Sequence, residues 1–154
     1  ITESGHKALI FSQWEQVTSV YKEALKAYNP AYIVGAVDPE DRQKEVGRFQ
    51  NDPTCKVAIG TIGAMGTGLT MTAASYVFFV DKRYWDAENK QAEDRAHRIG
   101  TTNTVNVVSL VATNTVDEGI DEMLRDNKAL FDRVVEGKGS RVDVGEILRK
   151  ILQY

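Results

Sequence analysis

The chain has 154 residues, of which 42% are hydrophobic and 27% charged, and this composition is typical of one globular domain without a membrane span. The single cysteine, Cys55, excludes an internal disulfide and a cysteine-rich zinc site, and no metal site is predicted. A net charge of -3 argues against a broad basic face that binds nucleic acid, although local phosphate contacts remain compatible with it.

Short apolar runs alternate with segments of helical periodicity along the chain. Strands are predicted at 7–11, 32–34, 56–59, 76–80 and 105–111, and helices at 14–28, 39–50, 87–99, 115–134 and 143–152. This alternation predicts a three-layer α/β fold with a mostly parallel sheet over residues 1–137, followed by a linker and a short C-terminal helix over 138–154.

The carboxyl ends of the predicted strands are the first place to look for a ligand site, because ligands of parallel α/β sheets bind there. Those ends are Ser12-Gln13, Gly35, Gly60-Thr61 and Asp81. Asp38 is predicted to cap the helix that begins at Pro39.

A glycine-rich segment at 60–68 follows the third strand. It is not a Walker A phosphate loop, because Leu69-Thr70 supplies no lysine, and its glycine spacing does not match a dinucleotide fingerprint. Two interpretations stay open. The glycines serve a turn that needs positive φ angles, or they allow a ligand to approach the backbone closely.

The segment 91–100 places two arginines on one predicted helical face. Gln91, Asp94, Arg95 and Arg98 share this face, beside a stripe of small packing residues. One interpretation is a solvated face with an ion pair between Asp94 and Arg98. The other is a pair of guanidinium groups directed at phosphate oxygens.

Arg42, in the predicted helix at 39–50, lies on the same helical stripe as Val46 and Phe49. This position directs the aliphatic part of its side chain toward the sheet.

Several segments, in this order, resemble motifs of the SWI/SNF (sucrose-non-fermenting) family of superfamily-two helicase-like ATPases. They are KALIFSQW at 7–14, the Gly-x6-Arg-x6-Phe spacing of Gly35, Arg42 and Phe49, TIGAMGTGLTMTAA at 61–74, and QAEDRAHRIG at 91–100. The last matches the family's motif VI residue for residue. The resemblance covers about residues 6–134 and implies the C-terminal RecA-like lobe, a fold of the P-loop NTPase type.

This resemblance implies half of an ATP site. In the family, ATP with Mg²⁺ is bound between two RecA-like lobes, mainly by the N-terminal lobe, and motif VI supplies arginine fingers. Arg95 and Arg98 take that role here, with Arg98 expected at the γ-phosphate. The resemblance also implies that Gln91 and Asp94 bind at the nucleotide site and position the finger helix, and that the backbone at Gly66 and Gly68 approaches the nucleotide. The residues that it implies in contact with DNA are Ser12, Gln13, Gly35, Arg42 and Thr61.

The resemblance therefore predicts the second motor lobe of a DNA-dependent ATPase that translocates on double-stranded DNA without sequence preference. We expect the lobe alone to hydrolyse no ATP. Because the chain begins at Ile1 rather than methionine, we expect a piece of a longer protein, located in the cytoplasm or nucleus. Two alternatives are a non-catalytic interaction module and a Rossmann-type enzyme, the latter disfavoured by the glycine spacing.

Overall fold

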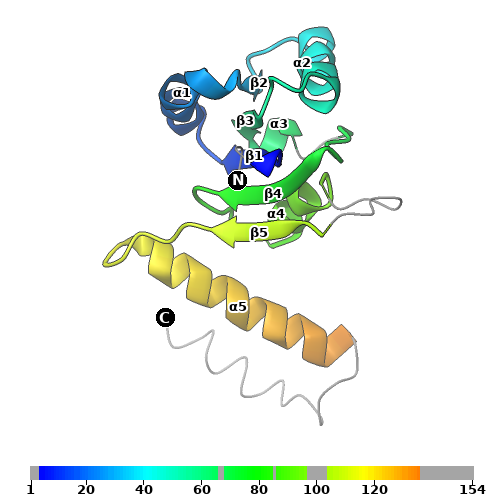
Figure 1. The fold of residues 1–154 in the computed structure, drawn as a ribbon. Helices are drawn as coiled ribbons and strands as arrows, with labels where there is room; N and C mark the ends of the chain where they lie inside the picture. Colours follow the sequence, from blue (N-terminus) through cyan, green and yellow to red (C-terminus); the bar gives the residue numbers. More distant parts are fainter. Residues whose placement is uncertain (1–3, 66–67, 85, 97–103, 136–154) are drawn as a thin grey trace.

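The computed structural model describes residues 4–65, 68–84, 86–96 and 104–135, with the backbone alone from residue 130 on. Strands and helices alternate as the sequence predicts (Figure 1). The strands are β1 (Lys7–Ser12), β2 (Ala31–Ile33), β3 (Val57–Thr61), β4 (Ala74–Phe79) and β5 (Asn106–Ser109). The helices are α1 (Glu15–Ala24), η2 (Lys26–Tyr28), α2 (Pro39–Asn51), α3 (Ile62–Met65), α4 (Asp86–Glu93) and α5 (Val116–Val135).

The five strands form one sheet in the order β2-β3-β1-β4-β5, and every neighbouring pair is parallel. Helix α1 lies on one side of the sheet, α2 and α3 lie on the other, α4 lies behind β4 and β5, and α5 runs beyond β5 (Figure 1). The predicted three-layer α/β fold with a parallel sheet is therefore confirmed.

The main core lies between the sheet and the helices α2, α3 and α4. Phe11 of β1 and Phe79 of β4 are fully buried, and their rings stack with centroids 5.3 Å apart. Phe49, Met65 and Ala92 close this core from the three helices, each with no exposed surface. Burial of each large side chain contributes roughly 1.5–3 kcal/mol, so this layer fixes the positions of the loops at the strand ends.

Two helix boundaries differ from the prediction. Asp38 stands at the N-cap of α2 before Pro39, as expected, but its side chain makes no capping hydrogen bond. Helix α4 ends at Glu93 instead of continuing to Ile99, and Asp94 to Ala96 form a turn. Residues 97–99, which the prediction included in this helix, lie outside the described residues.

Helix α5 is joined to the end of β4 by an ion pair between Lys82 Nζ and Asp121 Oδ1, 3.3 Å apart. Leu124 on the same helix is buried. The predicted linker and C-terminal helix at 138–154 lie outside the described residues, so the domain division at 137 stays a prediction. None of the helices in the described ranges is long and apolar enough to cross a membrane.

Candidate functional site

The parallel sheet brings the predicted strand-end residues to one edge, which we call the strand-end edge. It comprises Ser12, Gln13, Gly35, Thr61 and Asp81. Ser12 lies directly opposite Thr61 in the register of β1 and β3, and Ile33, two residues before Gly35, lies opposite Gly60. Because Phe79 pairs with Phe11, Asp81, two residues after the end of β4, lies beside Gln13, two residues after Phe11. The grouping expected from the sequence is therefore present.

Asp81 connects the ends of β1 and β4. Its carboxylate accepts a hydrogen bond from the Ser12 hydroxyl and another from the Gln13 backbone N–H at 2.7 Å. The Ser12 oxygen also accepts the N–H of Trp14 at 3.0 Å, and Ser12 is only 1% exposed. This serine is therefore bonded within the protein, and the edge presents Gln13 and the exposed Trp14 to solvent.

Sequence reasoning recognised Asp81 as a strand end but gave it no role. The available signal was a carboxylate placed directly after the most apolar strand of the chain. In a parallel sheet such a group lies beside the end of the neighbouring strand, where backbone N–H groups of the next loop have no partner in the sheet. The DNA contacts expected of Ser12, Gln13 and Gly35 remain predictions.

The glycine-rich segment combines two different requirements. A Cβ atom at Gly60 would lie 2.0 Å from the Ile33 carbonyl oxygen and 2.5 Å from Met65 Sδ, so this glycine allows close packing of β2 and α3. Gly68 has a φ of +70°, which favours glycine. The close approach at Gly60 is thus to the protein itself, and the predicted nucleotide contact of Gly68 stays a prediction. Gly66 lies outside the described residues.

Thr61 is the last residue of β3 and immediately precedes the short helix α3 at the strand-end edge. Its hydroxyl oxygen accepts the N–H of Ala64 at 3.4 Å. Helix α3 was not predicted, because the glycines around it lower helix propensity and only packing against the sheet compensates. Its residues Ile62, Ala64 and Met65 are buried, which explains why the helix forms.

Arg95 in the arginine segment lies against residues 69–71, which directly follow the glycine-rich segment. Arg95 Nη1 donates to the Leu69 carbonyl oxygen at 3.4 Å, and the Met71 N–H donates to the Arg95 carbonyl oxygen at 3.0 Å. The Met71 carbonyl in turn accepts the N–H of Ala74, the first residue of β4. Arg95 therefore lies toward the amino end of β4, away from the strand-end edge.

The other residues of this segment are placed as follows. Gln91 and Asp94 are exposed, while Ala92 and Ala96 are fully buried, as expected of the packing stripe. Asp94 lies 3.6 Å from Lys90 Nζ in an ion pair. Arg98 lies outside the described residues. The two interpretations of this face, an ion pair of Arg98 with Asp94 or a role of Arg98 as a finger, therefore both stay open.

Arg42 lies in the first part of α2, which follows β2. Its stripe partners Val46 and Phe49 are buried, which confirms the predicted direction of this helix face. The Arg42 Nε is buried and has no hydrogen-bond partner within the part of the chain that the structure describes. An unpaired donor of this kind is unfavourable in a folded protein, so this end of α2 has an unused hydrogen-bond donor.

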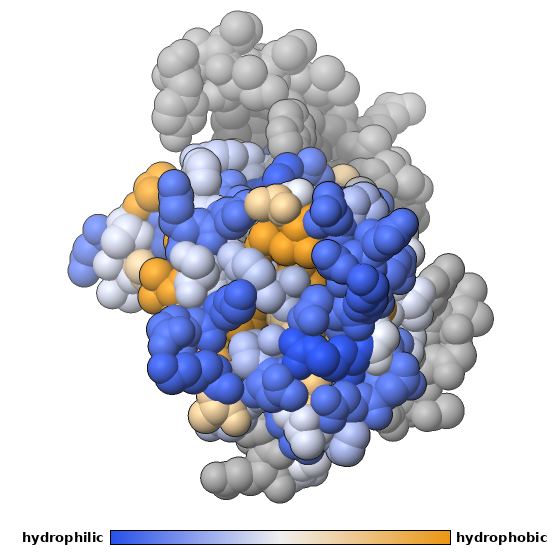
Figure 2. Space-filling view, turned by 90° about the horizontal axis from the view of Figure 1, so that it is seen from above, coloured by the Kyte–Doolittle hydropathy of each residue, from blue (hydrophilic) through white to orange (hydrophobic). Residues whose placement is uncertain are grey.

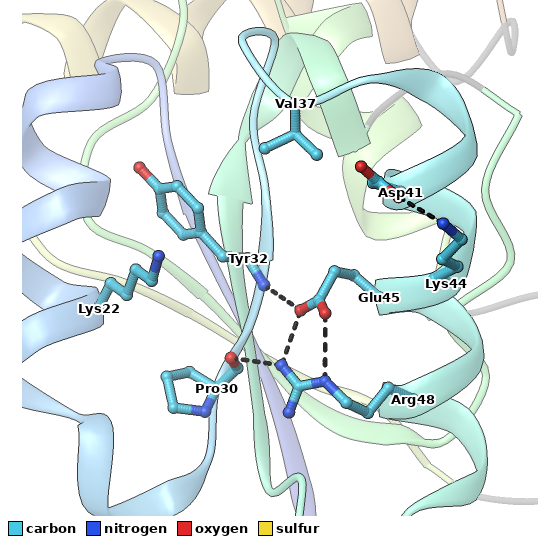
Figure 3. Close-up of a pocket in the computed structure, with 8 residues that line it drawn as sticks. All are labelled: Lys22, Pro30, Tyr32, Val37, Asp41, Lys44, Glu45 and Arg48. Atoms are coloured by element: carbon cyan, nitrogen blue, oxygen red, sulfur yellow. Dashed lines mark hydrogen bonds and ion pairs between the residues drawn. The ribbon is translucent and has the colours of Figure 1, made fainter.

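A hollow of about 390 Å³ lies along the outer edge of β2, between α1 and α2 (Figure 3). Figure 2 shows that mostly hydrophilic side chains cover this face, with hydrophobic ones in small areas only. The residues that line the hollow are Lys22, Pro30, Tyr32, Val37, Asp41, Lys44, Glu45 and Arg48.

The charges in this hollow protect an edge strand. Glu45 accepts the N–H of Tyr32 at 2.9 Å and Arg48 Nη2 at 2.7 Å, and Arg48 also donates to the Pro30 carbonyl oxygen at 2.8 Å (Figure 3). Partial burial raises the pKa of Glu45, but these hydrogen bonds and the nearby cations outweigh it, so the pKa lies below its ordinary value. The Glu45 carboxylate thus covers the outer edge of β2 by accepting one of its backbone N–H groups. The residues that line the hollow therefore have a structural role at this edge.

Comparison with known proteins identifies the lobe. The model of the helicase conserved C-terminal domain matches residues 1–100. The chain belongs to this family. Protein CHROMATIN REMODELING 19 of Arabidopsis thaliana is 35% identical to it over 161 residues, which cover 97% of this chain and 21% of that protein. The DNA annealing helicase and endonuclease ZRANB3 of Homo sapiens is 38% identical over 143 residues, which cover 91% of this chain and 13% of that protein.

A solved structure agrees with this assignment. The crystal structure of the C-terminal part of the Fun30 ATPase domain matches this helicase C-terminal domain with a TM-score of 0.75 and 28% identity, covering 80% of this chain and 40% of that chain. These relatives are SWI/SNF-family helicases, so the resemblance noted in the sequence is confirmed. The helicase C-terminal domain spans about a fifth or less of the length of the curated relatives named above.

The structure thus separates the predicted residues of this helicase C-terminal domain into two groups. Ser12, Gln13 and Thr61 lie at the strand-end edge. Arg95 and the segment 68–71 lie together toward the amino end of β4. The two groups therefore lie at different places on the lobe. The sequence analysis placed the first group at the strand ends and Arg95 on a helical face, and it did not relate the two positions to each other.

Proposed function

We propose that this chain is the second motor lobe of a DNA-dependent ATPase that translocates on double-stranded DNA. In this proposal the N-terminal RecA-like lobe of the same protein binds most of the ATP and Mg²⁺. The main support is that the strand-end edge and the group of Arg95 with residues 68–71 lie at different places, because a motor lobe needs one surface for nucleotide and another for DNA. The names of the relatives, among them a chromatin remodelling protein and a DNA annealing helicase, support DNA as the substrate and the nucleus as the location.

The nucleotide surface works through charge. Arg95 and Arg98 supply guanidinium groups to the γ-phosphate of an ATP bound by the first lobe, and they stabilise the charge that develops on the transferred phosphoryl group. Gln91 and Asp94 orient this segment, and the backbone at Gly66 and Gly68 approaches the nucleotide. The hydrogen bond from Arg95 to the Leu69 carbonyl keeps the arginine segment and the glycine-rich segment together.

The DNA surface is the strand-end edge together with the beginning of α2. Gln13, Gly35, Arg42 and Thr61 contact phosphates of one strand in this proposal. The buried Ser12, whose hydroxyl donates to Asp81, holds this edge in shape. The Arg42 Nε is buried without a partner within the described part of the chain, which is consistent with a guanidinium group that completes its hydrogen bonds on a ligand. Phosphate contacts position a protein on DNA without reading base sequence. A few such contacts are compatible with a chain whose net charge is -3.

Separate ATPase assays on the 154-residue chain and on the full-length protein test this function. We expect the chain alone to hydrolyse no ATP above background with or without DNA, because it lacks a Walker A sequence. The full-length protein is expected to hydrolyse ATP in a DNA-stimulated reaction. Turnover by the isolated chain, or a full-length protein indifferent to DNA, would contradict the proposal.

A further inference from the structure

Arg83 lies at the strand-end edge but belongs to none of the motifs found in the sequence. It follows β4 by four residues, two after Asp81. Its guanidinium group reaches the beginning of α3, because a Cβ atom added at Gly63 would lie 3.2 Å from Arg83 Nη2. Since Thr61 immediately precedes α3, this cation lies beside the end of β3.

A buried asparagine fixes the backbone of Arg83. Asn89 Oδ1 accepts the Arg83 N–H at 3.0 Å, and Asn89 Nδ2 donates to the Arg83 carbonyl oxygen at 2.8 Å. Asn89 is 2% exposed, so its amide is held within α4 and in turn fixes the loop. A side chain that bonds both backbone groups of one residue restricts the directions in which that residue can point.

The guanidinium group of Arg83 has unused donors. Nη1 donates to Glu88 Oε2 at 2.9 Å, in an ion pair whose side chains are 35% and 43% exposed. Within the described part of the chain, Nε is buried without a partner and Nη2 forms no hydrogen bond. An exposed ion pair of this kind contributes little to stability, so a stronger anion can displace Glu88.

We propose that Arg83 binds a backbone phosphate of DNA at the strand-end edge, and that Glu88 is the internal anion which this phosphate displaces. A planar guanidinium with free donors matches the geometry of a phosphate better than an ammonium group does. Asn89 is then a positioning residue, because it acts through the backbone of Arg83. This inference rests on the proposed DNA-dependent function and adds a residue and a competing ion pair to it.

Salt-dependent DNA binding by the full-length protein tests this inference. Arg83→Gln is expected to weaken duplex DNA binding roughly tenfold. It should also reduce the slope of log K against log salt concentration by about 0.9, the effect of losing one phosphate contact. The control is Lys26→Gln. This substitution removes a cation from another ion pair, in η2, where the side chain is 74% exposed, and it should change neither quantity.

Variants of Glu88 and Arg83 distinguish a phosphate contact from a structural role. Glu88→Gln should tighten DNA binding about two- to fivefold by releasing Arg83, and the gain should vanish in the Arg83→Gln background. If Arg83→Gln does not fold, Arg83→Lys should keep the wild-type salt slope, and a reduced slope would overturn the inference.

The remaining outcomes separate the two proposals. If Arg83→Gln binds with wild-type affinity and slope while the wild-type protein binds DNA and is stimulated by it, the inference is wrong and the proposed function stands. If the wild-type protein neither binds DNA nor responds to it, both fail. A Glu88→Gln gain that persists in the double variant would show a general charge effect and overturn the role of Glu88.

Discussion

Replacing Arg98 by alanine in the full-length protein should lower the rate of ATP hydrolysis by roughly 10³-fold or more while ATP affinity changes little. The expectation follows from the match of 91–100 to motif VI and from the proposed role at the γ-phosphate. An arginine that acts on charge developing in the transition state affects turnover more than ground-state binding. The measurements are kcat at saturating DNA and the Kd of a fluorescent ATP analogue.

Two further variants define the result for Arg98. Arg98→Lys should remain strongly impaired, because an ammonium group lacks the planar fork of donors. Arg125→Ala, on α5 where the side chain is 78% exposed, should change kcat less than about twofold and serves as the matched control. Unchanged turnover in Arg98→Ala would show that the finger is assigned to the wrong residue.

Gly60→Ala should lower the free energy of unfolding of the 154-residue chain by about 3 kcal/mol or more. The new Cβ would lie 2.0 Å from the Ile33 carbonyl oxygen, and a backbone atom paired in a sheet cannot move aside as a side chain can. Urea unfolding followed by circular dichroism measures the change, and Tm should fall by roughly 6–12 °C.

Gly47→Ala is the matched control for Gly60. Gly47 lies inside α2, and a Cβ atom there would meet nothing within 4 Å. The substitution should therefore stabilise the chain by about 0.5–1 kcal/mol through helix propensity. Equal stability of the Gly60→Ala and wild-type chains would contradict the packing of β2, β3 and α3 described above.

The order of elements could be predicted because periodicity and stop signals agree along this chain. The apolar run at β1 and the Asp38-Pro39 start of α2 depend only on local sequence, and the structure has both. The early end of α4 could not be predicted, because its helical pattern continues past Glu93. There the backbone carbonyl of Arg95 bonds Met71, a residue far away in the sequence.

The candidate site was predictable as a set of residue types and only partly as an arrangement. The register of the parallel sheet places Ser12 beside Thr61. The strand assignments predicted only that both residues stand at the carboxyl ends of strands, because they give neither the strand order nor the register. The distance of Arg95 from that edge depends on the direction of α4 and on the loop at 68–71. Similarly, Gly60 looked like part of a ligand loop, because the sequence does not show that Ile33 and Met65 occupy the space above it.

The central claim is that one lobe presents separate surfaces to DNA and to nucleotide. Hydrogen–deuterium exchange on the full-length protein, with duplex DNA or with a non-hydrolysable ATP analogue, tests it most directly. We predict that DNA slows exchange at 12–15 and 61–65, that the analogue slows exchange at 91–98, and that the outer edge of β2 around Tyr32 changes with neither. Slower exchange only along β2 and the hollow at Glu45, with the other segments unchanged, would contradict the account.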